Sequence, residues 1–161
     1  MKSIALTAAF SILASGAWAQ TVASNGFRVC PPEQTADGLK VVEDTCGSIQ
    51  RPDFTGSKFS SLSDLQAAMA QRDAFRAKAQ SYSECVNLFV ESYRRPGAPA
   101  DSTAPDQAAC AHAWAQDLAT ASVREFGRAC IAFADRSIID KDIEPYEGAC
   151  YLSANTQTGI G

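Results

Sequence analysis

Six cysteines are the residues of this chain with the clearest chemistry: Cys30, Cys46, Cys85, Cys110, Cys130 and Cys150. Thiols can pair as disulfides, bind metal ions or act as nucleophiles, and the redox compartment largely decides which of these occurs. Their spacing matches no zinc-binding pattern. We therefore expect structural disulfides, provided that the chain is exported.

The first 19 residues resemble an export signal. Lys2 supplies a positive charge, and residues 4–14 form an apolar stretch. Small residues at 17 and 19 then form the pattern that precedes a signal-peptidase cleavage site. No later segment approaches the roughly 20 apolar residues of a transmembrane helix. We expect cleavage after Ala19, a periplasmic or secreted protein, and no membrane span in the mature chain.

Other residues give no pattern typical of an active site. His112 is the only histidine and is flanked by alanines, which favours an ordinary helix position. Residues 140–144 carry alternating carboxylates, but Pro145 and Tyr151 occupy the sixth and twelfth positions, where a calcium-binding loop needs glycine and glutamate. Phosphate-binding loops and nucleophile elbows are also lacking. The sequence predicts no catalytic residue, no cofactor and no metal site.

The charge balance argues against a nucleic-acid partner. The formal net charge is −4, and the basic residues form only short clusters. A chain of this sign is repelled by phosphate backbones. Arg94, Arg95 and Trp114 are the candidates for contact with a protein partner.

Two long helical patterns must position these residues. The first runs from about residue 61 to 93, with apolar residues recurring every three or four positions, and the second runs from about 103 to 135. A turn containing Pro96 and Gly97 separates them, which is typical of antiparallel neighbours. We predict an all-α fold: a long two-helix hairpin over residues 61–136, with irregular disulfide-bonded segments at 20–60 and 137–161.

Helix geometry limits how the cysteines can pair. Cys110 and Cys130 would lie about 30 Å apart on one helix, whereas a disulfide needs Cα atoms within about 7 Å. Cys85 and Cys110 stand at similar heights in an antiparallel hairpin, so this is the leading pair. The simplest completion is Cys30 with Cys46 and Cys130 with Cys150.

A resemblance suggests a different pairing. Cys46 and Pro52, followed by a long helix rich in alanine, glutamine and arginine that ends in Ser-Tyr-Ser-Glu-Cys-Val at 81–86, resemble small exported helical-hairpin proteins of proteobacteria with no assigned activity. The resemblance covers residues 46–135. It implies a disulfide between Cys46 and Cys85. It implies a helical-hairpin fold but no chemical activity.

The expected function is therefore that of an exported, non-enzymatic scaffold, stabilised by disulfides, that binds an envelope or extracellular protein. Self-association through the hairpin seam is a further expectation, because a two-helix hairpin alone buries only a narrow apolar seam, which something else must cover. Two alternatives stay open. One is a small exported enzyme or enzyme inhibitor using Glu84, Arg94 and Arg95, or Asp117 and Arg124. The other is a redox or metal-binding module.

Overall fold

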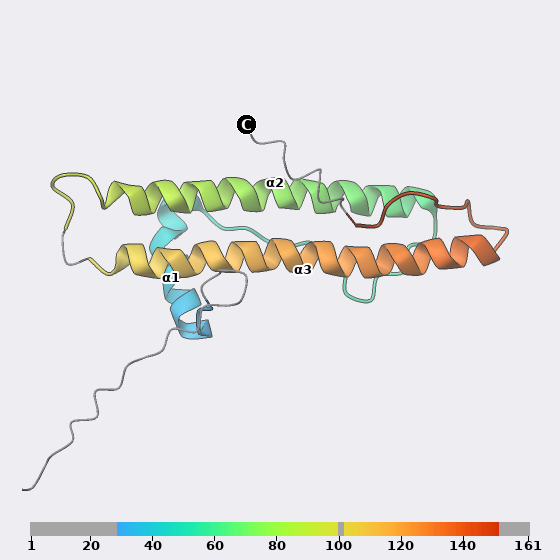
Figure 1. The fold of residues 1–161 in the computed structure, drawn as a ribbon, viewed down its shortest axis with the longest axis horizontal. Helices are drawn as coiled ribbons and strands as arrows, with labels where there is room; N and C mark the ends of the chain where they lie inside the picture. The colour runs from blue at the N-terminus through green and yellow to red at the C-terminus, as the bar shows by residue number, and fades with distance from the viewer. Residues whose placement is uncertain (1–28, 100–101, 152–161) are drawn as a thin grey trace, which may run out of the picture.

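A computed structural model describes residues 29–99 and 102–151 of the chain (Figure 1). This part contains three helices and no strand: α1 at Pro32–Cys46, α2 at Leu62–Ser92 and α3 at Ala104–Ile139. The expected all-α class is correct, but a third helix joins the expected pair. The predicted export signal and the tail from Asn155 onward lie outside the described residues.

The two long helices lie side by side and antiparallel, and α1 crosses them near the end where their connecting turn lies (Figure 1). The start of α2 follows from its cap, because the Ser61 hydroxyl accepts a hydrogen bond from the Asp64 amide at 3.1 Å. Gly97, with a φ of 91°, makes the turn before α3. Both long helices thus begin close to the predicted positions, and α3 continues to Ile139, beyond the predicted end at 135.

The helix α1 corrects the expectation that residues 20–60 are irregular. Pro32 is the first residue of α1, where a missing N–H costs nothing. Glu33 adds a favourable charge in the first turn. Gly38 and Val42 are buried, so one face of α1 packs on the long helices. Tertiary contact stabilises this short helix more than its own propensity does.

Two clusters of buried residues fill the interior. One lies under α1, at the end of the hairpin that carries the turn, and includes Val42, Phe75, Val86 and Ala111. The other lies toward the far end and is made by Phe54, Phe59, Leu65, Ala68, Phe126, Ala129, Cys130 and Phe133. The segment between α1 and α2 runs along the hairpin and supplies two of these phenylalanines (Figure 1). The narrow seam of the hairpin is therefore covered by α1 and by this segment.

Disulfides fix both ends of α1. Cys30, just before the helix, is bonded to Cys110 of α3, and Cys46, its last residue, is bonded to Cys85 of α2. The third bridge joins Cys130 to Cys150 and holds the C-terminal segment against α3. Cys46–Cys85 is the pairing that the resemblance implied, and Cys130–Cys150 belongs to the set expected from geometry.

The other two expected pairings, Cys30–Cys46 and Cys85–Cys110, do not form. The physical reason is α1 itself. A helix of 15 residues holds its ends roughly 20 Å apart, so the cysteines that flank it cannot reach each other. Each instead bonds to the long helix beside it. Cys85 and Cys110 consequently bond to opposite ends of α1 rather than to each other.

Candidate functional site

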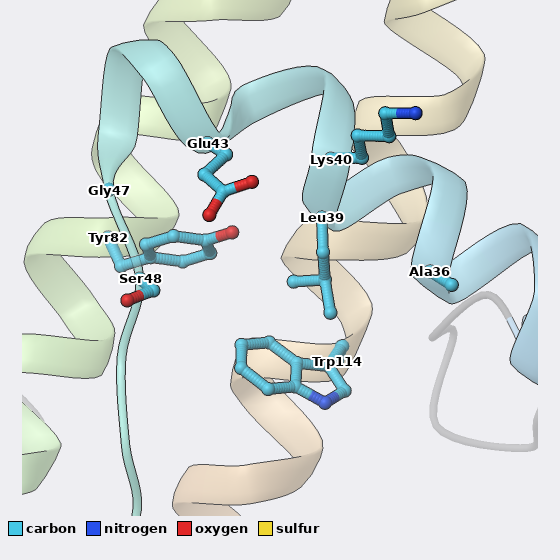
Figure 2. A pocket seen from close by; sticks show the side chains of 8 residues that line it. All are labelled: Ala36, Leu39, Lys40, Glu43, Gly47, Ser48, Tyr82 and Trp114. Carbon is cyan, nitrogen blue, oxygen red and sulfur yellow. The ribbon is translucent and has the colours of Figure 1, made fainter.

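A pocket opens where α1 crosses the long helices (Figure 2). Its volume is about 510 Å³, within the range of small-molecule sites in proteins. All three helices and the residues just after α1 contribute to it. The lining residues are Ala36, Leu39, Lys40, Glu43, Gly47, Ser48, Tyr82 and Trp114.

Aromatic side chains from the two long helices form the inner wall. Tyr82 of α2 and Trp114 of α3 meet edge to face, with ring centroids 6.3 Å apart and an angle of 67° between the rings. Leu39 extends from α1 toward Trp114 (Figure 2). Gly47 ends α1 with a φ of 67°, a conformation that favours glycine, and so redirects the chain beside the pocket.

The hydroxyl of Tyr82 is the polar group inside this wall. Only 4% of the residue is exposed, and its buried oxygen has no hydrogen-bond partner among the residues that the structure describes. Burial, and then the negative charge of Glu43, raise the pKa of Tyr82 above its ordinary value of 10.0, so the phenol is neutral at physiological pH. A buried polar group without a partner is unusual and marks a place where a ligand could supply one.

Two charged residues of α1, Lys40 and Glu43, stand at the rim of the pocket, and both are exposed. The carboxylate of Glu43 is turned toward the Tyr82 ring, whereas the amine of Lys40 points away from the pocket (Figure 2). Among the described residues, neither side chain forms an ion pair. The pocket thus combines an apolar interior with a carboxylate at its edge.

Of the three candidates for contact with a partner, Trp114 lies in this pocket. The guanidinium of Arg94 instead pairs with the carboxylate of Glu91 at 2.6 Å on an exposed surface near the end of α2. Arg95 is exposed in the turn that follows. Neither arginine lines the pocket, so the structure does not bring the three candidates together.

The residues considered for an exported enzyme or inhibitor also stay apart from the pocket. Glu84 accepts a hydrogen bond from Gln80 on the exposed face of α2. Asp117 and Arg124 are exposed on α3, about two helical turns apart. None of them contributes to the pocket lining.

His112 is half-buried on α3, beside Cys110 but outside the pocket. Its Nε2 atom is buried without a hydrogen-bond partner, and burial lowers the pKa of the imidazole below 6.5. Every cysteine of the chain is in a disulfide, and the described residues include no group of three or more potential metal ligands.

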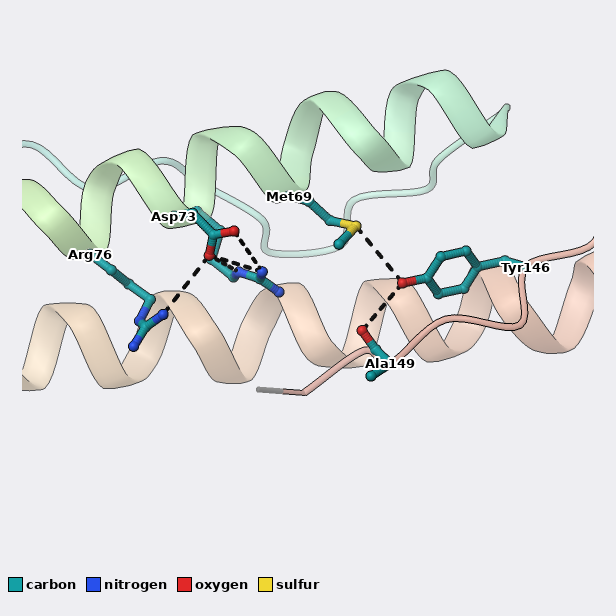
Figure 3. A network of polar contacts seen from close by, with 6 residues as sticks. Met69, Asp73, Arg76, Tyr146 and Ala149 are labelled. Carbon is teal, nitrogen blue, oxygen red and sulfur yellow. Dashed lines mark hydrogen bonds and ion pairs between the residues drawn. The ribbon is translucent and has the colours of Figure 1, made fainter. Parts of the chain in front are cut away.

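A second polar arrangement holds the far end of the molecule together. The guanidinium of Arg72 is buried, lies 4.4 Å from the centroid of the Phe126 ring, and donates from Nε to Asp73 at 2.9 Å. Asp73 also lies 3.9 Å from Arg76. Figure 3 shows this pair beside Tyr146, whose hydroxyl donates to the Ala149 carbonyl oxygen at 3.2 Å. The Arg72–Phe126 contact joins α2 to α3, and the approach of the Tyr146 hydroxyl to the Met69 sulfur at 3.8 Å joins the C-terminal segment to α2, so these contacts have a structural role.

Sequence reasoning missed most of the pocket. Tyr82 belongs to the apolar stripe of the first predicted helix, which favours a core position over a place in an interaction surface. Leu39 and Glu43 fall in the segment expected to be irregular. A signal is present, because Leu39, Val42 and Cys46 recur at helical spacing and Pro32 stands where a helix can begin.

None of the described helices is long and apolar enough to cross a membrane. Comparison of the chain with protein-family models, with curated proteins and with solved structures gives no match.

Proposed function

We propose that this chain is an exported, non-enzymatic binding protein, in which three disulfides stabilise a helical scaffold and the pocket beneath α1 receives a small ligand. The observation that carries the proposal is the buried Tyr82 hydroxyl without a hydrogen-bond partner in an aromatic pocket of about 510 Å³. An apolar cavity with a few polar groups that converge on it is the usual form of a small-molecule site.

The scaffold supports this role because it holds the pocket walls in fixed positions. Leu39 and Glu43 lie between Cys30 and Cys46, whose bridges attach α1 to both long helices. The pocket is therefore largely formed before a ligand arrives, which lowers the entropic cost of binding.

Export is the second part of the proposal. Three disulfides fit an oxidising compartment, and residues 1–19 carry the pattern of a signal peptide. Cell fractionation combined with thiol alkylation tests this part. We expect the mature protein outside the cytoplasm, with all its cysteines resistant to alkylation until a reductant is added. A cytoplasmic protein with free thiols would overturn it.

Binding is tested with three probes that share a phenyl group and differ in charge: 2-phenylethanol, phenethylammonium and phenylacetate. Saturation-transfer NMR on the full disulfide-bonded chain should detect at least one of them. Leu39→Trp should abolish that signal because the larger side chain fills the pocket. Leu88→Trp is the matched control, since Leu88 is 69% exposed on α2 and outside the pocket.

Circular dichroism of each variant checks that helicity is unchanged. If Leu39→Trp disturbs the fold, Ser48→Trp blocks the pocket from the exposed segment after α1. Failure of all three probes to bind the wild-type chain, or binding that persists in both blocked variants, contradicts the proposed site.

A further inference from the structure

The charged groups of the pocket distinguish among classes of ligand. Glu43 and Lys40 both line it, but Figure 2 shows the carboxylate of Glu43 turned inward over Tyr82 and the amine of Lys40 turned outward. The net charge of −4 over the whole chain also favours the approach of a cation over that of an anion. The electrostatics at the pocket mouth therefore fit a positively charged ligand.

The apolar wall fits a cation as well. Ring faces of tyrosine and tryptophan attract ammonium groups through their quadrupoles, and tryptophan does so most strongly. Tyr82 and Trp114 provide two such rings at 6.3 Å, and Leu39 provides an aliphatic surface opposite Trp114. A ligand with an apolar body and a cationic end would use all of these surfaces.

The hydroxyl of Tyr82 can donate and accept a hydrogen bond, whereas the Glu43 carboxylate beside it only accepts, so the two together favour a ligand with several N–H donors. The phenol is neutral, its oxygen is buried without a partner, and in Figure 2 it points between Glu43 and Leu39. A primary ammonium carries three N–H donors, so it could donate to this oxygen and to the Glu43 carboxylate together.

We propose that the pocket binds a small primary organic ammonium ion, with its apolar body against Trp114 and Leu39 and its charged nitrogen between the Tyr82 hydroxyl and the Glu43 carboxylate. This inference rests on the proposed function, because it names the ligand class of the same pocket.

Isothermal titration calorimetry of the full disulfide-bonded chain at neutral pH, with the three phenyl probes, tests the inference. Phenethylammonium should bind about tenfold more tightly than 2-phenylethanol, because its charge pairs with the Glu43 carboxylate and its nitrogen donates to the Tyr82 hydroxyl, and phenylacetate should bind most weakly. Glu43→Gln should remove most of this preference, because the amide carries no negative charge. Glu33→Gln, at an exposed residue of α1 outside the pocket, is the matched control and should leave the preference for the ammonium in place.

Tyr82→Phe should weaken the binding of phenethylammonium about threefold or more, since one hydrogen bond is lost while the ring remains. Circular dichroism and retention of the three disulfides show that each variant is folded. Glu43 is exposed, so Glu43→Gln is not expected to disturb the fold.

The outcomes separate the two proposals. If 2-phenylethanol or phenylacetate binds as tightly as phenethylammonium, or if Glu43→Gln leaves the ammonium affinity unchanged, the cation assignment is overturned while the pocket remains a binding site. If no probe binds, the proposed function and the cation assignment both fail. Tight binding of phenethylammonium that Leu39→Trp does not block places the cation elsewhere on the chain and overturns the assignment.

Discussion

The glycine at position 38 determines how closely α1 approaches α3. It lies in the middle of α1 and is buried. A Cβ atom built at this position would overlap the carbonyl oxygen of Gln107, lie 3.0 Å from the amide nitrogen of Ala111, and lie 3.3 Å from the Cβ of Cys110. The first two atoms belong to the backbone of α3, which cannot move aside as a side chain can. We predict that Gly38→Ala destabilises the protein.

The magnitude follows from two opposing effects. Adding a methyl group to a packed interface costs about 1–3 kcal/mol, whereas replacing glycine by alanine inside a helix gains about 1 kcal/mol. The disulfides at both ends of α1 keep the helix from moving away as a unit, so the steric cost should lie toward the upper end of that range. The net loss in the free energy of unfolding should be about 1–2 kcal/mol.

Gly127 is the matched control, because it is a second buried glycine within a helix. The three atoms nearest to a Cβ atom there all belong to the ring of Tyr151, a side chain that is 46% exposed and can rotate away. Gly127→Ala should therefore leave the free energy of unfolding unchanged or raise it by up to about 1 kcal/mol. The two variants make the same chemical change and differ in whether backbone or a movable side chain opposes it.

Urea unfolding followed by far-ultraviolet circular dichroism, under non-reducing conditions, measures both variants by linear extrapolation. Mass spectrometry confirms that the three disulfides are present. The reasoning is refuted if Gly38→Ala is as stable as the wild-type protein, or if Gly127→Ala is destabilised to the same extent.

Two further predictions concern the bridges and the acid stability. Removing Cys30–Cys110 by alanine at both positions should cost about 0.7 kcal/mol more than removing Cys130–Cys150, because with Cys46–Cys85 intact it closes a loop of about 40 residues, against about 20, and a longer loop restricts the unfolded chain more. Urea unfolding of the two double variants checks this order, and the reverse order would count against the loop-entropy account. Burial lowers the pKa of His112, so the unfolded chain binds its proton more readily and the stability contributed by the neutral imidazole falls as the pH drops below about 6.5. His112→Gln should lose less stability than the wild-type protein between about pH 7 and pH 5, and equal losses in both would contradict this assignment.

Local signals in the sequence were sufficient for the two long helices. These signals are the apolar stripes of α2 and α3, the serine before α2 and the Pro96–Gly97 turn. Each involves residues close together in the sequence, so the spacing of apolar residues in a helix can be recognised without knowing which distant segment packs on it. The same holds for the Cys130–Cys150 bridge, since α3 ends at Ile139 and the short chain that follows can return to it.

The sequence alone could not place α1, because that helix depends on a contact made far along the chain. Gly38 allows the close approach to α3, and Val42 is buried only because the long helices lie beneath it. Without that placement, Cys30 and Cys46 are close enough in sequence to pair, and Cys85 and Cys110 lie at similar heights in an antiparallel hairpin. The crossing helix changes both pairings at once.

What the sequence determined by itself was therefore the helical class, the starts of the two long helices and the expectation of an oxidised, exported chain. Only the tertiary structure decided the candidate site, because Glu43, Tyr82 and Trp114 come from three different helices. Periodicity shows which face of a helix is buried, but it does not show which other helix covers that face. The packing of α1 across the hairpin supplies that information, and it creates the pocket.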